Sequence, residues 1–289
     1  MLMPSTTDDV VDLVGAGGVG RSFAMRLGMY GRRSRLWTRR ARADIERQLN
    51  RDLESLARAR PRCDTAGIAG LIEIHDGGEV SMADAWLVIE FVEESIVTKR
   101  SVLRTISDAV QPDTAIGTGT STLCPSELAA YVDHPHRLFG IHPFSPVTLS
   151  SVIEFCRPQG ADPGVVGSIA ALLSSLDLHV VEVPDRPAYL FNRVFLNWMA
   201  GAINADETGE RFADIDCLVR LGNHVPRGPF ELMDLIGLDT ILDCFQNLSR
   251  LGFPGYEAAS TRLRMLVAEG RTGVGHGAGF YLYSLREDR

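Results

Sequence analysis

Several features that define other classes of protein are missing from this 289-residue sequence. No apolar run approaches the roughly 18–20 residues that a bilayer-spanning helix needs, so no membrane segment is predicted. Acidic residues outnumber Lys and Arg by 37 to 29, whereas a nucleic-acid-binding protein needs a basic surplus on at least one face. The residues after Met1 lack a basic stretch followed by an apolar one, so no secretory signal is predicted.

Cysteine is also scarce, and the five that occur are Cys63, Cys124, Cys156, Cys217 and Cys244. Their number is odd and no two of them form a Cys-x-x-Cys pair. Neither a disulfide framework nor a zinc site is therefore indicated, and no metal is expected. We interpret these residues as reduced thiols of a cytoplasmic protein, buried as small apolar side chains.

What the sequence does contain is an alternation of strand and helix patterns up to about residue 184. Strands are predicted at Val10–Val14, Arg35–Trp37, Leu71–His75, Trp86–Phe91, Ala115–Ile116, Arg137–Ile141, Val152–Phe155 and His179–Val183. Helices are predicted at Arg21–Tyr30, Arg42–Arg60, Thr98–Ala109 and Pro125–Tyr131. Alternation of this kind implies crossover units, and we expect a doubly wound parallel sheet of the Rossmann type.

The pattern changes at the proline-bracketed segment 184–187, after which only helices are indicated. These are predicted at Leu190–Ala205, Ala213–Leu221, Pro229–Leu248 and Tyr256–Glu269. The sequence therefore predicts a dinucleotide-binding domain over residues 1–184. A smaller all-helical domain over residues 185–289 should serve substrate binding and dimerisation.

A glycine-rich turn follows the first predicted strand and precedes the first predicted helix. Gly15, Gly17 and Gly20 fit the pattern G-x-G-x-x-G, in which the first glycine permits a tight turn and the second lets the backbone approach a pyrophosphate. The third allows close packing of the helix on the strand. A tight turn without a ligand is the alternative, but the strand–turn–helix context favours a dinucleotide cofactor.

The end of the second strand bears on which cofactor is used. An enzyme specific for NAD places an acidic residue here, about 20 residues after the glycines, to bind the ribose hydroxyl. This chain has the neutral Thr38 followed by Arg39 and Arg40. Because guanidinium groups bind a phosphate and a carboxylate repels one, NADP is favoured over NAD. The alternative is that both arginines are solvated charges at the start of a helix.

Ordered motifs along almost the whole chain resemble those of the 3-hydroxyacyl-CoA dehydrogenase family. In the first domain they are the segments 88–94 (VIEFVEE), 117–121 (GTGTS), 140–146 (GIHPFSP) and 152–154 (VIE). In the second they are 191–193 (FNR), 228–239 (GPFELMDLIGLD) and 279–283 (GFYLY). Each motif alone is modestly specific, whereas the ordered combination is strongly so.

The resemblance implies roles that oxidation of a secondary alcohol also requires. His142 matches the family's catalytic base, and imidazole suits proton transfer near neutral pH. Glu154 matches the carboxylate that orients this histidine, while Ser121 and Asn192 match groups that hydrogen-bond the substrate oxygens. A purely structural histidine, a turn-forming serine and a helix-capping asparagine are the alternatives.

Two further matches concern the cofactor and the carrier of the acyl group. Glu94 and Lys99 match family residues near the nicotinamide side of the cofactor site. Four arginines lie in or just after the segment that flanks the coenzyme A entrance in the family, at positions 51, 58, 60 and 62. They are candidates to meet coenzyme A phosphates or an acyl carrier protein, although a solvated arginine-rich helix is an equal alternative.

The chain departs from the family pattern close to the expected reaction centre. The loop 118–121 reads Thr-Gly-Thr-Ser where the family has Ser-Asn-Thr-Ser, and the segment 142–146 reads His-Pro-Phe-Ser-Pro in place of His-Phe-Phe-Asn-Pro. A lysine that usually precedes the last Gly-Phe-Tyr is absent. These changes leave the proposed catalytic residues in place and make the identity of the substrate uncertain.

The sequence thus predicts an oxidoreductase that uses NADP or NAD to interconvert a 3-hydroxyacyl thioester and its 3-ketoacyl form. A dehydrogenase of a small free hydroxy acid is one alternative. A non-catalytic, dinucleotide-binding structural relative is another. A homodimer is expected through the second domain, because the stretches Leu232–Leu238 and Ile241–Leu248 are apolar around much of their helices.

Overall fold

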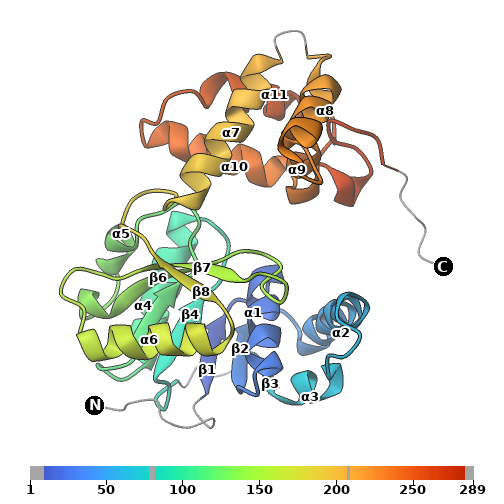
Figure 1. Cartoon of the computed structure of the whole chain (residues 1–289). Coiled ribbons are helices and arrows are strands. Elements are labelled where there is room, and N and C mark those ends of the chain that lie inside the picture. The colour runs from blue at the N-terminus through green and yellow to red at the C-terminus, as the bar shows by residue number, and fades with distance from the viewer. Residues whose placement is uncertain (1–9, 78–81, 207–208, 284–289) are drawn as a thin grey trace. The chain divides into compact units, whose positions relative to one another are not determined.

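The computed structural model describes residues 10–77, 82–206 and 209–283 of the chain (Figure 1). The chain forms two compact units, one ending at Arg186 and the other beginning at Pro187. In the described part of the chain, no helix combines the length and the apolar character needed to cross a membrane.

The first unit is built on an eight-stranded sheet of order β3-β2-β1-β4-β5-β6-β7-β8. The strands are β1 (Val11–Val14), β2 (Ser34–Thr38), β3 (Ile72–Asp76), β4 (Leu87–Glu90), β5 (Ala115–Thr118), β6 (Leu138–Pro143), β7 (Val152–Cys156) and β8 (His179–Glu182). The first six strands follow the 3-2-1-4-5-6 order of a dinucleotide-binding fold, whose order reverses between β1 and β4. The prediction of a Rossmann-like α/β domain is confirmed.

Helices cover both faces of this sheet (Figure 1). The helices α1 (Gly18–Met29), α2 (Arg42–Ala59), α3 (Thr65–Gly70) and α6 (Pro163–Ser175) share one apolar core with the sheet. The helices α4 (Ile96–Ala109) and α5 (Pro125–Ala129) share the other. Because side chains alternate along a strand, odd-numbered residues of β4 and β5 face the first core and even-numbered ones the second.

One strand pair overturns the prediction of a wholly parallel sheet. β6 and β7 run antiparallel, with His142 opposite Glu154. They are joined by the loop 144–151, which is shorter than the dozen residues or more that a parallel crossover needs. The residue pattern also does not predict α6, whose sequence begins Pro-Gly-Val-Val-Gly and is poor in strong helix formers. Asp162 starts that helix by accepting hydrogen bonds from the backbone N–H groups of Gly164 and Val165.

The second unit is all helical, as predicted. It contains α7 (Phe191–Ala205), α8 (Phe212–Asn223), α9 (Pro229–Ile236), α10 (Leu238–Arg250) and α11 (Glu257–Ala268). The single helix predicted over Pro229–Leu248 is wrong, because Gly237 separates α9 from α10 with φ +108°. An L side chain rarely adopts this conformation, so glycine permits the break between the two helices.

Two buried carboxylates hold the second unit together. Asp216 on α8 accepts the backbone N–H groups of Phe230 and Glu231 at the start of α9, at 2.9 and 3.0 Å. Asp234 on α9 accepts the backbone N–H groups of Phe280 and Tyr281 at 2.8 and 2.9 Å. Burial raises the pKa of both aspartates, although these hydrogen bonds oppose the shift. The carboxylate of Asp234, within the motif 228–239, therefore joins the segment 279–283 to the helices.

Candidate active site

The glycine-rich turn between β1 and α1 has the conformation that its sequence predicts. Gly15 has φ +113°, and a Cβ atom there would lie 2.6 Å from the carbonyl oxygen of Phe91. A Cβ atom on Gly20 would lie 1.9 Å from the carbonyl oxygen of Gly15. Gly17 has no atom within 4 Å of its Cβ position. The turn is thus packed tightly at two glycines and is open at the third, where a pyrophosphate would approach.

Arg21 braces this turn from the first helix. Its guanidinium group donates hydrogen bonds to the carbonyl oxygen of Ala16 at 2.8 Å, to Gln48 Oε1 at 2.7 Å and to Asp52 Oδ2 at 2.7 Å. The last two partners lie on α2. The arginine therefore links the turn to α2, an arrangement that neither the glycine motif nor helical periodicity predicts.

The carboxyl end of β2 presents Thr38 and two exposed arginines, Arg39 and Arg40. Thr38 accepts the backbone N–H of Arg40 at 3.0 Å. Asp76 lies opposite Thr38 on β3, and its carboxylate accepts the backbone N–H of Arg42 at 2.5 Å. The carboxylate opposite Thr38 in the strand register is therefore engaged at the start of α2.

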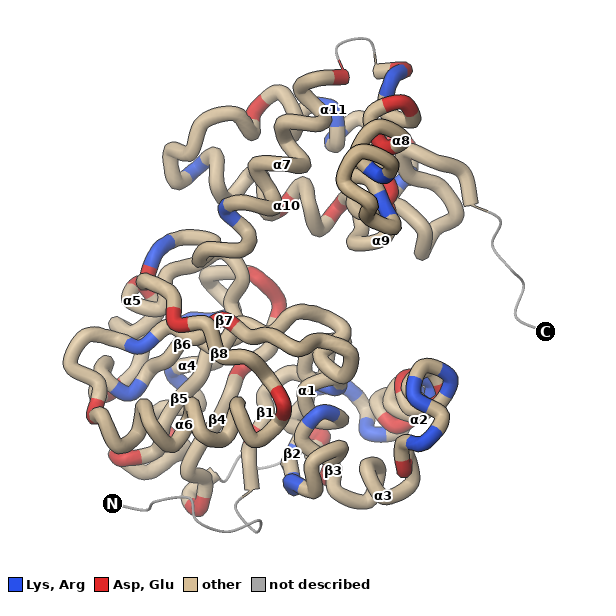
Figure 2. Tube along the Cα trace, viewed as in Figure 1, with Lys and Arg blue, Asp and Glu red and all other residues tan. Residues whose placement is uncertain are grey.

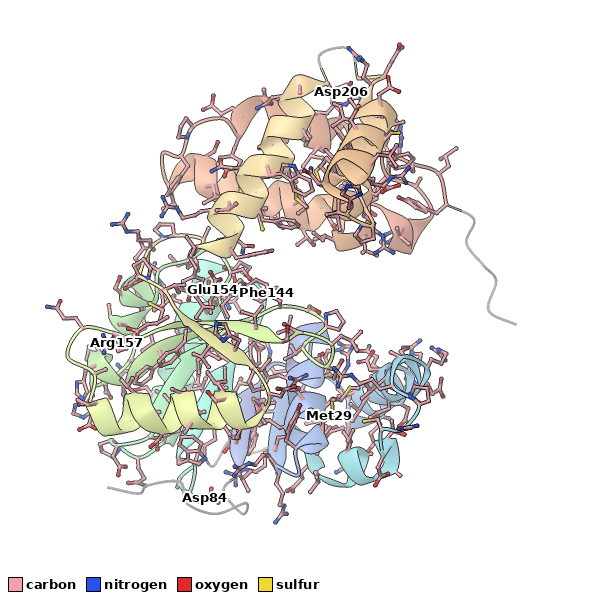
Figure 3. The ribbon with its side chains drawn as sticks, viewed as in Figure 1. Met29, Asp84, Phe144, Glu154, Arg157 and Asp206 are labelled. Carbon is pink, nitrogen blue, oxygen red and sulfur yellow. The ribbon has the colours of Figure 1, made fainter. Side chains whose placement is uncertain are left out.

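Three of the four predicted catalytic residues meet at the carboxyl end of the sheet. His142 Nδ1 lies 2.7 Å from Glu154 Oε2, and His142 Nε2 lies 3.1 Å from Ser121 Oγ. His142 and Glu154 are almost fully buried, with 6% and 3% of their surfaces exposed. Figure 3 labels Glu154 beside Phe144, whose ring packs edge-on against the imidazole at a centroid distance of 5.2 Å. One ring nitrogen therefore faces a carboxylate and the other faces a hydroxyl.

Glu94 fixes the loop that carries Ser121. Its Oε1 accepts the backbone N–H groups of Ser121 and Thr122 at 3.0 and 2.7 Å and the hydroxyl groups of Thr120 and Thr122 at 2.5 and 2.8 Å. Burial alone would raise the pKa of Glu94. The Lys99 charge and these hydrogen bonds outweigh that effect and hold the pKa below its ordinary value. The carboxylate is therefore ionised at neutral pH.

Lys99 connects this loop to a carboxylate that the sequence analysis missed. Its ammonium group lies 3.0 and 3.1 Å from the two oxygens of Glu90 and 3.5 Å from Glu94 Oε2. Glu90 is completely buried at the end of β4 and also accepts hydrogen bonds from the Thr118 hydroxyl and the Val92 N–H. A charged residue within the apolar segment 87–92 was the available signal.

The glycine at position 119, where the family has asparagine, has a structural reason. A Cβ atom there would lie 2.3 Å from the ring of Phe91 and 3.1 Å from the carbonyl oxygen of Glu90. Any larger residue would collide with the aromatic side chain that follows β4. Glycine in place of the family's asparagine at position 119 therefore makes room for the ring of Phe91.

Asn192 lies in the first turn of α7 in the second unit and is partly buried. The alternative that it caps this helix does not hold, because the N-cap position is Leu190 and no side chain caps the helix there.

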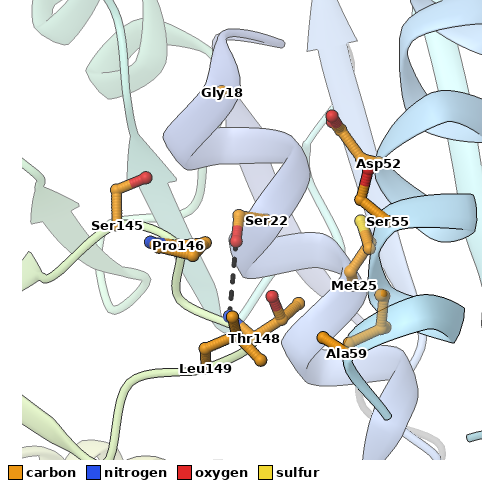
Figure 4. Close-up of a pocket in the computed structure, with 11 residues that line it drawn as sticks. Gly18, Ser22, Met25, Asp52, Ser55, Ala59, Ser145, Pro146, Thr148 and Leu149 are labelled. Carbon is orange, nitrogen blue, oxygen red and sulfur yellow. Dashed lines mark hydrogen bonds between the residues drawn. The ribbon is translucent and has the colours of Figure 1, made fainter. Parts of the chain in front are cut away.

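A cavity of about 220 Å³ opens in the first unit between α1, α2 and the loop that joins β6 to β7 (Figure 4). Ser22 and Met25 of α1, Ser55 of α2, and Pro146 and Leu149 of the loop line this cavity. The backbone N–H of Thr148 donates a hydrogen bond to Ser22 Oγ at 3.3 Å. The loop that leaves His142 therefore forms one wall of this cavity.

Comparison with known proteins agrees with this geometry. Residues 10–186 match the NAD binding domain of 3-hydroxyacyl-CoA dehydrogenases, and residues 189–283 match their C-terminal domain. A probable 3-hydroxybutyryl-CoA dehydrogenase of Bacillus subtilis is 31% identical over 94% of this chain and 96% of its own length.

Solved structures of similar proteins extend over nearly the whole chain. The (S)-3-hydroxybutyryl-CoA dehydrogenase of Ralstonia eutropha has a TM-score of 0.84 at 25% identity, covering 96% of this chain and 99% of its own. FadB2 of Mycobacterium tuberculosis has a TM-score of 0.88 at 26% identity, covering 95% and 98%.

The fold and the site together define a dinucleotide-dependent oxidoreductase with a histidine–carboxylate pair. The chain belongs to the 3-hydroxyacyl-CoA dehydrogenase family, as its motifs predicted. The activity of this class is the NAD-dependent oxidation of 3-hydroxyacyl-CoA to 3-ketoacyl-CoA.

Proposed function

We propose that this protein transfers a hydride between a nicotinamide dinucleotide and C3 of an acyl thioester, with His142 as the acid–base group. The observation that carries the proposal is the placement of His142 between Ser121 Oγ and Glu154 Oε2. With a carboxylate holding one nitrogen of the imidazole, the other nitrogen can exchange a proton with a substrate hydroxyl at the Ser121 side.

Each side chain has a definite task in this reaction. Glu154 accepts a hydrogen bond from Nδ1–H of His142 and stabilises the imidazolium that forms when Nε2 takes the hydroxyl proton. Ser121 and Asn192 donate hydrogen bonds to the substrate oxygens and thereby orient the reacting carbon. Gly15, Gly17 and Gly20 would hold the cofactor, with Glu94 and Lys99 near its nicotinamide end. When bound, the cofactor supplies the hydride acceptor.

Coenzyme A is the carrier that we propose for the acyl group. The support is the cavity beside α2, together with the four exposed arginines of residues 51–62, none of which forms an ion pair within the described residues. Lys/Arg and Asp/Glu are interspersed around α2 in Figure 2. The carrier phosphates would therefore meet individual arginines in this region.

A substrate panel tests this function. Turnover is measured with 3-hydroxybutyryl-CoA, the same acyl group on an acyl carrier protein, and free 3-hydroxybutyrate, each with both cofactors. We expect the CoA thioester to be the preferred substrate. Preference for the free acid would support the small-acid alternative, and binding of cofactor without turnover of any substrate would indicate a non-catalytic relative.

We further propose that NADP is the preferred cofactor. Thr38 supplies no charge to repel a 2′-phosphate, and Arg39 is exposed next to it. One charge-assisted contact contributes roughly 1.5–3 kcal/mol, which corresponds to about tenfold to hundredfold discrimination.

Fluorescence titration with NADPH and NADH measures this preference. Arg39→Ala should weaken NADPH binding selectively, and Thr38→Asp should shift the preference toward NADH by adding a ribose contact and a repulsive charge. Arg47→Ala, which removes an exposed arginine farther along α2, is the control and should leave the preference unchanged. Equal or tighter binding of NADH by the unmodified protein would defeat the proposal.

We propose a homodimer formed through the second unit. The predicted stretch Ile241–Leu248 does not support it, because Ile241, Leu242, Phe245 and Leu248 are buried within the unit's own core. The support comes instead from the adjacent helices α8 and α9, which leave large apolar side chains exposed. These are Leu218 and Leu221, each 70% exposed, and Leu235 and Ile236, 50% and 42% exposed.

Light scattering at micromolar concentration should give twice the mass of one chain. Replacing Leu218 and Leu221 together with aspartate should produce a monomer, because two charges would be buried unpaired in the interface. Val97→Asp is the matched control, since Val97 is equally exposed at 73% but lies on α4 of the first unit. A monomer mass for the unmodified protein would refute the dimer.

We also propose that the protein acts in the cytoplasm. Its five cysteines are all free thiols in the described structure, and Cys124 and Cys156 are buried. Burial raises the pKa of both to about 12, so they stay protonated and unreactive.

A further inference from the structure

A cluster of three charged side chains, of which two are buried and Glu94 is partly exposed, lies next to the reaction centre. Lys99 contacts both oxygens of Glu90 at 3.0 and 3.1 Å and Glu94 Oε2 at 3.5 Å. N–H and O–H groups also donate hydrogen bonds to these two carboxylates, from Val92 and Thr118 to Glu90 and from the loop 120–122 to Glu94. Counted by formal charge, two carboxylates and one ammonium group give this cluster a net charge of minus one.

Lys99 is the single lysine of the chain, whereas arginine supplies every other fixed cation. Its side chain is 1% exposed. Its compact ammonium group donates hydrogen bonds to both Glu90 oxygens and to the carbonyl oxygen of Val92 at 3.3 Å, and it forms an ion pair with Glu94 Oε2 at 3.5 Å. The ammonium group of Lys99 thus contacts two carboxylates at once.

The cluster is close to where the nicotinamide ring must lie. Glu94 binds the backbone N–H of Ser121, and Ser121 Oγ is 3.1 Å from His142 Nε2. Hydride transfer needs the reacting carbon of the substrate within about 3–3.5 Å of the ring. If His142 and Ser121 hold the substrate oxygen, the ring binds within a few ångströms of the Glu94 loop.

We infer that the net negative charge of Glu90, Lys99 and Glu94 makes the protein favour the oxidised, cationic nicotinamide ring over the neutral reduced one. This inference rests on the proposed function. In ketone reduction, the carbonyl carbon gains a hydride with its electron pair, the carbonyl oxygen gains a proton from His142, and the ring becomes positively charged. A negative cluster stabilises that product state, so it biases the bound equilibrium toward the 3-hydroxyacyl form.

Affinity for the two redox forms of one cofactor tests the inference without turnover. Dissociation constants of the oxidised and reduced forms of the preferred dinucleotide are measured by titration of the full-length protein. In Glu94→Gln, the amide still accepts hydrogen bonds from the loop 120–122, but the net charge becomes zero. We expect the ratio of the oxidised to the reduced dissociation constant to rise about tenfold, since a charge at roughly 8 Å is felt strongly at an effective dielectric constant of about 20.

Two control variants test whether the change in the ratio comes from the charge of Glu94 or from a change in the shape of its side chain. Glu94→Asp keeps the charge and should keep the ratio, even if both affinities fall. Glu93→Gln makes the same chemical change at an exposed neighbour and should leave the ratio unchanged because water screens it. If Glu94→Gln does not fold, Glu90→Gln removes the same charge and should raise the ratio in the same direction.

The outcomes distinguish this inference from the function on which it rests. An unchanged ratio in a folded Glu94→Gln protein that binds both forms overturns the inference and leaves the proposed function standing. An equal shift in Glu94→Asp also overturns it, because the charge would then not be the cause. Failure of the unmodified protein to bind either form would overturn both.

Discussion

Replacement of His142 with alanine is expected to lower turnover at least about a hundredfold, the low end for the loss of a general acid–base group. The reason is geometric. His142 is the residue whose ring nitrogens face both a carboxylate, at 2.7 Å, and the Ser121 hydroxyl, at 3.1 Å. Cofactor affinity should change little, because the glycine turn belongs to another part of the sheet. Steady-state rates and cofactor titration on the same preparation measure both quantities.

Two further variants serve as a control and as a comparison for His142→Ala. His179→Ala removes an exposed histidine of β8 and should leave turnover unchanged. Glu154→Gln should cause a smaller loss than His142→Ala, because the imidazole keeps a hydrogen-bond partner but loses a charged one. Near-normal turnover in a folded His142→Ala protein would remove this residue as the base.

Gly17→Ala is expected to weaken cofactor binding about tenfold to hundredfold while leaving thermal stability unchanged. The Cβ position of Gly17 has no atom within 4 Å, so a methyl group there costs the empty protein little. The same methyl group would occupy the space through which a pyrophosphate approaches the backbone. The loss of one hydrogen bond to a charged group, roughly 1.5–3 kcal/mol, sets the expected range.

The other glycines supply the contrast. Gly20→Ala should lower the melting temperature as well as cofactor affinity, because its Cβ atom would lie 1.9 Å from the carbonyl oxygen of Gly15. Gly70→Ala places a methyl group in equally open space at the end of α3 and should affect neither. Unchanged cofactor affinity in Gly17→Ala would mean that no phosphate approaches this turn.

Local chemistry explains which parts of the fold were predictable. A turn that needs positive φ at Gly15 and lacks room for a Cβ at Gly20 can be recognised from residue types at fixed spacing. Apolar strands and amphipathic helices are likewise visible in short windows. Predictions failed where the local sequence only weakly favours an element and packing in the folded chain stabilises it. The helix Pro163–Ser175 is rich in valine and glycine, yet its buried face packs on the sheet.

The sequence by itself determined the family, the α/β and all-helical architecture, the glycine turn and the identities of Ser121, His142 and Glu154. Only the tertiary structure decided how these residues meet. His142 and Glu154 are opposite each other because β6 and β7 pair antiparallel. Contacts between distant segments also decide which side chains of α8 are exposed. They likewise decide which carboxylates lie around the single lysine. Residue types specify what a local backbone can do, whereas strand pairing and burial are properties of the whole folded chain.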